Sequence, residues 1–164
     1  MIETPRLIIK DLQLEDALRF SEYRDKSEVA RFQSWNRYPL KKAQKRIEQC
    51  LEKPICSKPG NYQLGIYLKD NEYLIGDFYI DIEGKKSFSL GYTIDSPYWG
   101  KGYGNEALQR LLEYMYQEYN LKLCTCRVYN DNYRSINLLL KNGFKEVSRS
   151  KFYQDILYSK RIDV

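Results

Sequence analysis

The sequence predicts an α+β fold with a mixed, mostly antiparallel sheet. Three β-like segments follow one another across two short polar turns, at residues 69–72 and 83–85, which is typical of an antiparallel meander. After them, helix-like and strand-like segments alternate to the end of the chain. No repeat, low-complexity segment or linker divides the 164 residues, so we expect a single domain over residues 1–164.

In the first half of the chain, Leu7–Ile9 forms a short expected strand. Acidic residues at 15–16 precede an apolar spacing that predicts a helix ending near Arg24. Residues 25–39 show no regular pattern, a second helix is expected over 40–51, and Pro and Gly mark a loop around 54–60. The three strands of the meander are expected at 62–68, 73–82 and 86–94.

In the second half, residues 102–119 place Leu108, Leu111, Leu112 and Met115 on one stripe, as in a helix that packs against a core. A strand at 121–129, a helix at 135–142 and a last strand at 152–159 follow.

Composition excludes several classes of protein. The chain has no histidine, and its four cysteines lack metal-ligand or CxxC spacing, so Ser-His-Asp and Cys-His hydrolases and a metal site are not expected. No apolar run reaches the length of a membrane span, and Met1–Pro5 does not resemble a signal peptide, so we expect a cytoplasmic protein without membrane contact. The net charge of +5 comes from scattered lysines and arginines, which makes nucleic acid an unlikely partner.

The segment from Trp99 to Leu108 carries the strongest functional signal. Gly100, Gly102 and Gly104 alternate along it and lead directly into the helix. Glycine permits turns that other residues avoid, and the first amides of a helix have no partners and carry partial positive charge. The segment therefore predicts an anion site for a phosphate or pyrophosphate. A tight turn that only caps the helix is the alternative.

Two familiar phosphate loops do not fit. A Walker-type loop requires Gly-Lys followed by Ser or Thr, but Gly102 follows Lys101. A dinucleotide fingerprint requires a third glycine where the chain has Asn105 or, in the looser form, Ala107.

Instead, Trp99-x-x-Gly102-x-Gly104 resembles the acyl-CoA pyrophosphate loop of the GNAT acetyltransferase superfamily. That loop usually begins with Gln or Arg, and the branch similar to ribosomal-protein N-terminal acetyltransferases commonly has Trp there. Further motifs follow in the family's order over nearly the whole chain: Glu3-Thr4-Pro5-Arg6-Leu7, Leu74-Ile75-Gly76, Leu90-Gly91-Tyr92, and Asn132-x-x-Ser135 before Gly143-Phe144.

The resemblance implies a GNAT-like sheet with splayed middle strands, flanked by about four helices. The splayed strands would be those ending near Ile94 and running from Leu121. Acetyl-CoA is the implied co-substrate, with its pantetheine arm in the gap and its pyrophosphate on the glycine loop. Its implied contacts are Tyr92, Thr93, Ile94, Trp99, Gly100, Lys101, Gly102, Tyr103, Gly104, Asn105, Asn132 and Ser135. Lys101 is equally well explained as a surface lysine, Asn132 as a turn residue and Ser135 as a helix N-cap.

For catalysis, the resemblance places Ser135 near the leaving sulfur. Relatives often carry a Glu just before Leu-Gly-Tyr, but this chain has Ser89. Strand alternation puts Asp77, Tyr79 and Asp81 on the face opposite the core residues 78, 80 and 82, and we choose Asp81 as the catalytic carboxylate. Other candidates near the acceptor are Tyr129, Tyr133 and Tyr153, and catalysis by proximity and a water relay is an alternative.

The resemblance thus implies an acetyl-CoA-dependent N-acetyltransferase, in which a primary amine attacks the thioester directly. The acceptor would be a protein N-terminus or a small amine, such as a polyamine or an aminoglycoside. Arg31, Phe32 and Trp35 either line the acceptor groove or form a satellite core. A non-catalytic acyl-CoA-binding module is the alternative function, and a homodimer is possible.

Overall fold

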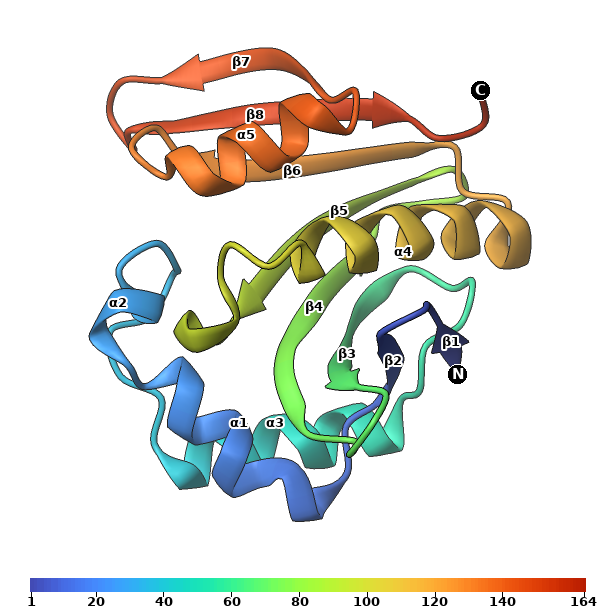
Figure 1. The fold of residues 1–164 in the computed structure, drawn as a ribbon. Helices are drawn as coiled ribbons and strands as arrows, with labels where there is room; N and C mark the ends of the chain where they lie inside the picture. The colour runs from blue at the N-terminus through green and yellow to red at the C-terminus, as the bar shows by residue number, and fades with distance from the viewer.

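The computed structural model describes all residues, 1–164, and contains one eight-stranded sheet (Figure 1). The strands lie in the order β1-β2-β3-β4-β5-β6-β8-β7, and every neighbouring pair is antiparallel except β5 with β6. The predicted mixed, mostly antiparallel sheet is therefore confirmed. The strands are β1 (Ile2–Glu3), β2 (Leu7–Asp11), β3 (Gly60–Leu68), β4 (Leu74–Ile82), β5 (Ser87–Ile94), β6 (Leu123–Tyr129), β7 (Lys145–Ser150) and β8 (Asp155–Arg161).

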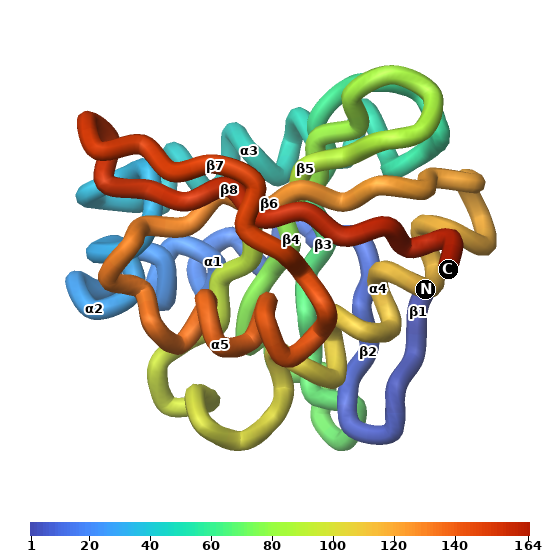
Figure 2. Tube along the Cα trace, turned by 90° about the horizontal axis from the view of Figure 1, so that it is seen from above, coloured from blue at the N-terminus to red at the C-terminus, as the bar shows by residue number.

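Five α-helices cover the two faces of the sheet. They are α1 (Ala17–Arg24), α2 (Ser27–Ala30), α3 (Leu40–Glu52), α4 (Tyr103–Tyr119) and α5 (Tyr133–Lys141). Helices α1 to α3 lie on one side of the sheet, and α4 and α5 lie on the other (Figures 1 and 2). Four of the five match helices expected from the sequence, whereas the single turn of α2 and the strands β1 and β7 were not predicted.

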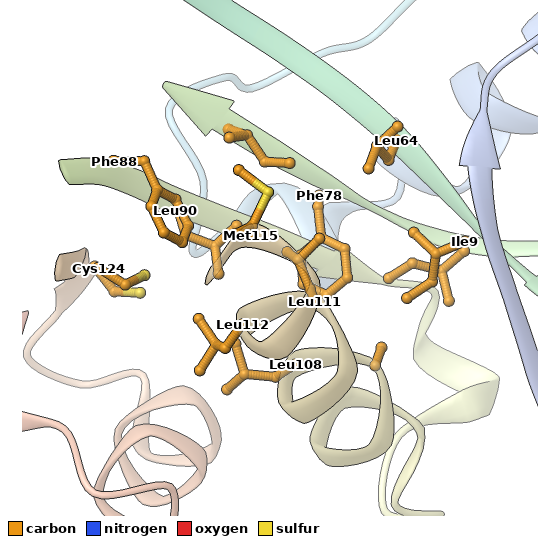
Figure 3. Packing of buried hydrophobic residues seen from close by; sticks show 14 of the residues in the cluster. Ile9, Leu64, Phe78, Phe88, Leu90, Leu108, Leu111, Leu112, Met115 and Cys124 are labelled. Carbon is orange, nitrogen blue, oxygen red and sulfur yellow. The ribbon is translucent and has the colours of Figure 1, made fainter. Parts of the chain in front are cut away.

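Side-chain alternation along the strands gives each face its own core. On the α4 side, Leu111 and Met115 pack against Ile9 and Phe78 of the sheet within a cluster of 24 buried residues (Figure 3). On the α1–α3 side, a second cluster of 10 buried residues includes Ile8, the immediate neighbour of Ile9. The chain therefore buries both faces of its first strands, and the helices are fixed in position on either side of β4 and β5.

A buried ion pair fastens α1 to the centre of the sheet. Asp77 on β4 is 1% exposed and accepts hydrogen bonds from Arg24 (2.7 and 2.8 Å), the Tyr23 hydroxyl (2.5 Å) and the Gln63 amide (2.8 Å). Burial and the neighbouring Asp77 raise the pKa of Tyr23, so its hydroxyl remains a donor. The Arg24 guanidinium also lies 3.8 Å from the centre of the Trp35 ring.

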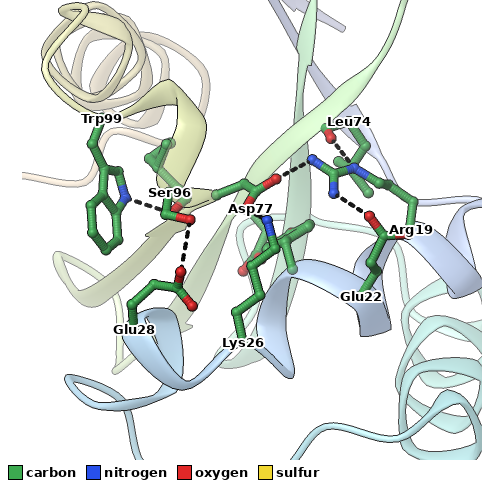
Figure 4. Close-up of polar contacts among 11 residues, drawn as sticks. Arg19, Glu22, Lys26, Glu28, Leu74, Asp77, Ser96 and Trp99 are labelled. Atoms are coloured by element: carbon green, nitrogen blue, oxygen red, sulfur yellow. Dashed lines mark hydrogen bonds and ion pairs between the residues drawn. The ribbon is translucent and has the colours of Figure 1, made fainter.

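The end of β5 is held by a second polar cluster. Asp95 is 2% exposed and accepts hydrogen bonds from Arg19 (2.5 Å) and Lys26 (2.7 Å), which belong to α1 and the turn before α2. Figure 4 shows Arg19 between the Leu74 carbonyl and Glu22, with Trp99 near Ser96 on the other side of the cluster. The first cluster therefore fixes the middle of β4, and the second fixes the end of β5, which leads into the glycine loop.

Replacing Asp77 with alanine is expected to lower the free energy of unfolding by about 3–5 kcal/mol, because Arg24 would keep a buried charge without a partner. Asp81→Ala is the matched control, since Asp81 lies on the same face of β4 and takes part in no ion pair. Denaturant unfolding of both variants measures the difference. Equal, small losses in both variants would contradict this account.

Candidate active site

Strands β5 and β6 pair over three residues only and then separate. Their parallel register joins Ser87, Phe88 and Ser89 of β5 to residues 123–125 of β6, and no pairing continues beyond Ser89. From there β5 stays paired with β4, while β6 stays paired with β8 along its whole length. The structure therefore contains the splayed pair that the family resemblance implied, and β5 has an open edge from Leu90 to Ile94.

The phase of the β4–β5 ladder decides which backbone groups face this gap. The Asp95 N–H donates to the Ile75 carbonyl (2.8 Å), so residues 95 and 75 form a hydrogen-bonded pair. Such pairs alternate along an antiparallel ladder, so Thr93 and Asp77 form the next one. The backbone N–H and C=O groups of Tyr92 and Ile94 therefore point away from β4. Consistently, the Tyr92 carbonyl accepts a bond from Gln33 (3.3 Å) and the Ile94 carbonyl from Trp99 (2.7 Å). Tyr92 and Ile94 thus present backbone to the gap, whereas the backbone of Thr93 faces β4, contrary to expectation.

The glycine loop presents a row of unpaired donors at the start of α4. Gly100 and Gly102 have φ of 73° and 83°, values that favour glycine, and Gly102 is the N-cap of the helix. None of the six amide N–H groups from Gly100 to Asn105 donates a hydrogen bond within the protein. Because these donors lie at the positive end of a 17-residue helix, the loop is suited to bind an anion.

Thr4 and Arg6 of the N-terminal segment fix the glycine loop and the first turn of α4 by hydrogen bonds. Arg6 donates from Nη1 to the Lys101 carbonyl (2.9 Å) and from Nε to Glu106 in the first turn of α4 (2.8 Å). Glu106 also accepts a bond from the Thr4 hydroxyl (2.5 Å). Although burial opposes ionisation, the bonds from Thr4 and Arg6 lower the pKa of Glu106. These contacts give a physical role to Thr4 and Arg6 of the Glu3–Leu7 motif that carries part of the family resemblance.

A first cavity of about 280 Å³ lies beside the loop on the α4–α5 side of β5. Eleven of the twelve residues expected to bind the cofactor line it: Tyr92, Thr93, Ile94, Trp99, Gly100, Gly102, Tyr103, Gly104, Asn105, Asn132 and Ser135. Lys101 does not line it, and its amino group lies 5.8 Å from the centre of the Tyr98 ring. Sequence reasoning missed Arg134 and Lys141, which add two cations to the lining.

Two hydroxyl groups meet in this cavity. Tyr92 Oη and Ser135 Oγ are 2.5 Å apart, and both residues line the cavity wall. Burial raises the pKa of Tyr92 above its ordinary value of 10.0, so its hydroxyl is protonated at neutral pH. Asn132 is the N-cap of α5 and accepts a bond from the Ser135 N–H (3.4 Å). Ser135 lies in the first turn of the helix and is therefore not the N-cap that the alternative interpretation made it. Both residues line the cavity.

A second cavity of about 620 Å³ opens on the opposite side of the sheet. It lies among α1, α3 and the strands from β3 to β8, and it shares Phe32, Gln33, Tyr92 and Thr93 with the first cavity. The two cavities therefore meet at the open edge of β5. Phe32 and Trp35 line the second cavity as one sequence interpretation expected, whereas Arg31 lies at the surface and pairs with Asp131 (3.5 Å).

Comparison with known proteins identifies the family. The model of the acetyltransferase (GNAT) domain matches residues 6–145. The chain belongs to the GNAT acetyltransferase family. It is 26% identical over 155 residues to the uncharacterized N-acetyltransferase p20 of Bacillus licheniformis, covering 92% of this chain and 85% of that relative. It is therefore an N-acetyltransferase, and acetyl-CoA is its co-substrate.

Solved structures share the fold of this GNAT enzyme. The ribosomal-protein-S5-alanine acetyltransferase of Vibrio fischeri superimposes with a TM-score of 0.79 at 19% identity, over 98% of this chain and 96% of that one. The spermidine N-acetyltransferase of Vibrio cholerae, in complex with CoA and spermine, gives 0.83 at 15% identity, over 98% of each chain. None of the helices has the length and apolar content needed to cross a membrane, and no group of three His, Cys, Asp or Glu side chains is arranged to hold a metal ion.

The carboxylates of this acetyltransferase are distributed differently from the expectation. Asp81 lines neither cavity and lies four residues along β4 from Asp77, about 13 Å away at the usual rise of a strand. Asp77 and Asp155 are the carboxylates that line the second cavity. Asp155, on β8, was not predicted as a site residue. Of the tyrosines considered, Tyr79 and Tyr129 line the cavity and Tyr133 and Tyr153 do not.

Gly100→Ala is expected to weaken CoA binding by on the order of tenfold, because a side chain at this positive φ strains the turn that aligns the loop amides. Gly84→Ala is the control, since Gly84 has a similar φ of 87°, open space around it and a position in the β4–β5 turn. Calorimetric titration with CoA measures the affinity of both variants for CoA. Equal affinity in the two variants would contradict the assignment of the loop.

Proposed function

We propose that acetyl-CoA binds in the first cavity and that a primary amine enters through the second, so that the two meet at the open edge of β5. The observation that carries this proposal is that the cavities approach this edge from opposite faces and share Tyr92 and Thr93. The acceptor is a peptide N-terminus or a small amine, the two kinds of acceptor named for the structurally similar alanine and spermidine acetyltransferases.

The residues of the first cavity fit a CoA molecule in three respects. The six free amides from Gly100 to Asn105 match the oxygens of a pyrophosphate. Tyr92 and Ile94 offer backbone groups to the amides of the pantetheine arm, which would add to β5 as a further strand. Arg134 stacks 3.5 Å from the centre of the Trp99 ring and, with Lys141, complements the phosphate charge.

Acetyl-CoA supplies the thioester carbonyl that the amine attacks. The Tyr92 N–H faces the gap and is the donor best placed for the oxyanion. The hydrogen-bonded hydroxyls of Tyr92 and Ser135 line the same cavity, and we assign to them the protonation of the departing sulfur. Because burial raises the pKa of Tyr92, this donor stays protonated throughout the neutral range.

Removing these hydroxyls tests the assignment. Tyr92→Phe and Ser135→Ala are each expected to lower kcat by about 10²-fold, the range of a lost proton donor, with little change in the KM for acetyl-CoA. The measurement is release of free thiol from acetyl-CoA with a panel of amines. Ser89→Ala is the control, since Ser89 lies on the same strand and lines neither cavity. Release of thiol with none of the amines would argue for the binding module instead.

Asp155 is the carboxylate best placed to take a proton from the amine. Asp77 accepts bonds from three side chains, whereas Asp155 accepts one, from Arg127 at 3.2 Å. Asp155 pairs in register with Tyr129, and the parallel register of β5 and β6 brings that position level with Thr93 across the gap. We therefore assign to Asp155, directly or through a water molecule, the role given to Asp81 from the sequence.

Asp155→Asn is expected to lower kcat by about 10²-fold at pH 7 and by much less at pH 9–10. The reason is that peptide amines, whose pKa is near 8, are already neutral at the higher pH and no longer need a base. A pH profile of thiol release measures this, with Asp81→Asn as control. A loss of the same size at every pH would exclude Asp155 as the base and leave the water relay.

A further inference from the structure

The second cavity carries an excess of positive charge. Four cations line it, on Arg24, Lys42, Arg46 and Arg127, against the carboxylates of Asp77 and Asp155. Both carboxylates are already paired, Asp77 with Arg24 at 2.7 Å and Asp155 with Arg127 at 3.2 Å. Lys42 and Arg46, one turn apart on α3, are left without a carboxylate partner.

Arg46 is held in place by neutral groups only. Its Nε donates to the Gln63 side-chain oxygen (2.7 Å) and its Nη1 to that of Asn61 (2.9 Å). Its Nη2 is buried and has no hydrogen-bond partner. A fixed guanidinium with a free donor and no counter-ion is costly unless an anion completes it. Lys42 lies nearby, with its amino group 4.8 Å from the centre of the Tyr38 ring, and supplies a second charge.

The register of the sheet gives the distance from Arg46 to the reacting edge. Gln63 of β3 lies opposite Tyr79 of β4, and Tyr79 lies opposite Gly91 of β5. Two strand spacings separate Gln63 from β5, about 10 Å in all. The guanidinium is also 5.5 Å from the centre of the Tyr79 ring, which places it above β3 and β4. An anion bound there would be roughly 7–10 Å from an amine at the open edge of β5.

We propose that this cavity selects a peptide N-terminus whose second or third residue is acidic. The inference rests on the proposed function, because it takes the second cavity as the acceptor site. An extended peptide advances about 3.4 Å per residue, so the side chains of residues 2 and 3 reach the required distance. The carboxylate of a free α-amino acid is too close to its own amine. A polyamine would place a second ammonium group beside Lys42 and Arg46, where it is repelled.

Binding to the enzyme saturated with CoA tests this without turnover. The probes are octapeptides beginning with Ala that differ only at positions 2 and 3, as Asp-Glu, Asn-Gln or Lys-Lys, together with spermidine and glutamate. Calorimetry is expected to show the Asp-Glu peptide binding at least tenfold more tightly than the Asn-Gln peptide, with a preference that shrinks as salt is added. Equal affinities, tighter binding of the Lys-Lys peptide, spermidine or glutamate, or no peptide binding at all would overturn the proposal.

Variants that remove single charges from α3 test which side chains cause the preference for the acidic peptide. Lys42→Gln and Arg46→Gln are each expected to reduce the preference for the Asp-Glu peptide by on the order of tenfold, through KM rather than kcat. Lys45→Gln is the matched control, because it removes the same charge from the same helix but does not line the cavity. The Lys42 side chain makes no hydrogen bond to the protein, whereas that of Arg46 makes two, so the Lys42 variant remains informative if the loss of Arg46 disturbs the fold. An unchanged preference in Lys42→Gln and in a folded Arg46→Gln variant would overturn the assignment.

The two proposals fail in different ways. Acetylation of neutral and acidic peptides at equal rates and affinities would overturn the charge selection and leave the proposed function standing. Tight, CoA-dependent binding of the acidic peptide without thiol release would retain the anion site and overturn the proposed reaction.

Discussion

The separation of β5 from β6 after Ser89 is the constraint on which the rest of the structure depends. Unpaired strand edges inside a protein carry backbone donors and acceptors that need partners. The gap persists because each strand is fully paired on its other side, β5 with β4 and β6 with β8. Trp99 and Gln33 satisfy the carbonyls of Ile94 and Tyr92. The amides of the same two residues remain available to a bound molecule.

An open strand edge is useful only if its position is fixed, and the N-terminal region supplies that rigidity. The ion pair between Arg24 and Asp77 fixes the middle of β4. Arg19 and Lys26 pair with Asp95 and fix the end of β5. Arg6 pairs with Glu106 and fixes the start of α4. All four ion pairs join residues at least 53 positions apart in the chain. The opening segment of the sequence therefore surrounds a site to which it contributes few lining residues.

Sequence reasoning found residues that line one cavity where these residues are neighbours in the chain. The alternating glycines before α4 and the Asn132-x-x-Ser135 turn are local patterns, and the structure brings both to one cavity. Alternation on β4 gave the correct face for Asp81 but not the position along the strand at which the cavity opens. Asp155, Lys42 and Arg46 come from elements whose convergence no local pattern encodes. Strand β7 was missed because all but the last of its six residues are exposed and show no alternation.

Both cavities carry an excess of positive charge, and this charge suits acetyl transfer to an amine. Cations and free amides in the first cavity match an anionic co-substrate, while Lys42 and Arg46 give the second cavity the same sign. Nearby positive charge lowers the pKa of a bound ammonium group, and acetyl transfer requires that group in its neutral form. If the second cavity is the acceptor site, as proposed, its positive charge would hold an anionic part of the acceptor and would also favour loss of the proton from its amine. Because the pKa of the ammonium group would be lowered in this environment, removing its proton would require a weaker base. A carboxylate that accepts only one hydrogen bond, such as Asp155, would then be sufficient.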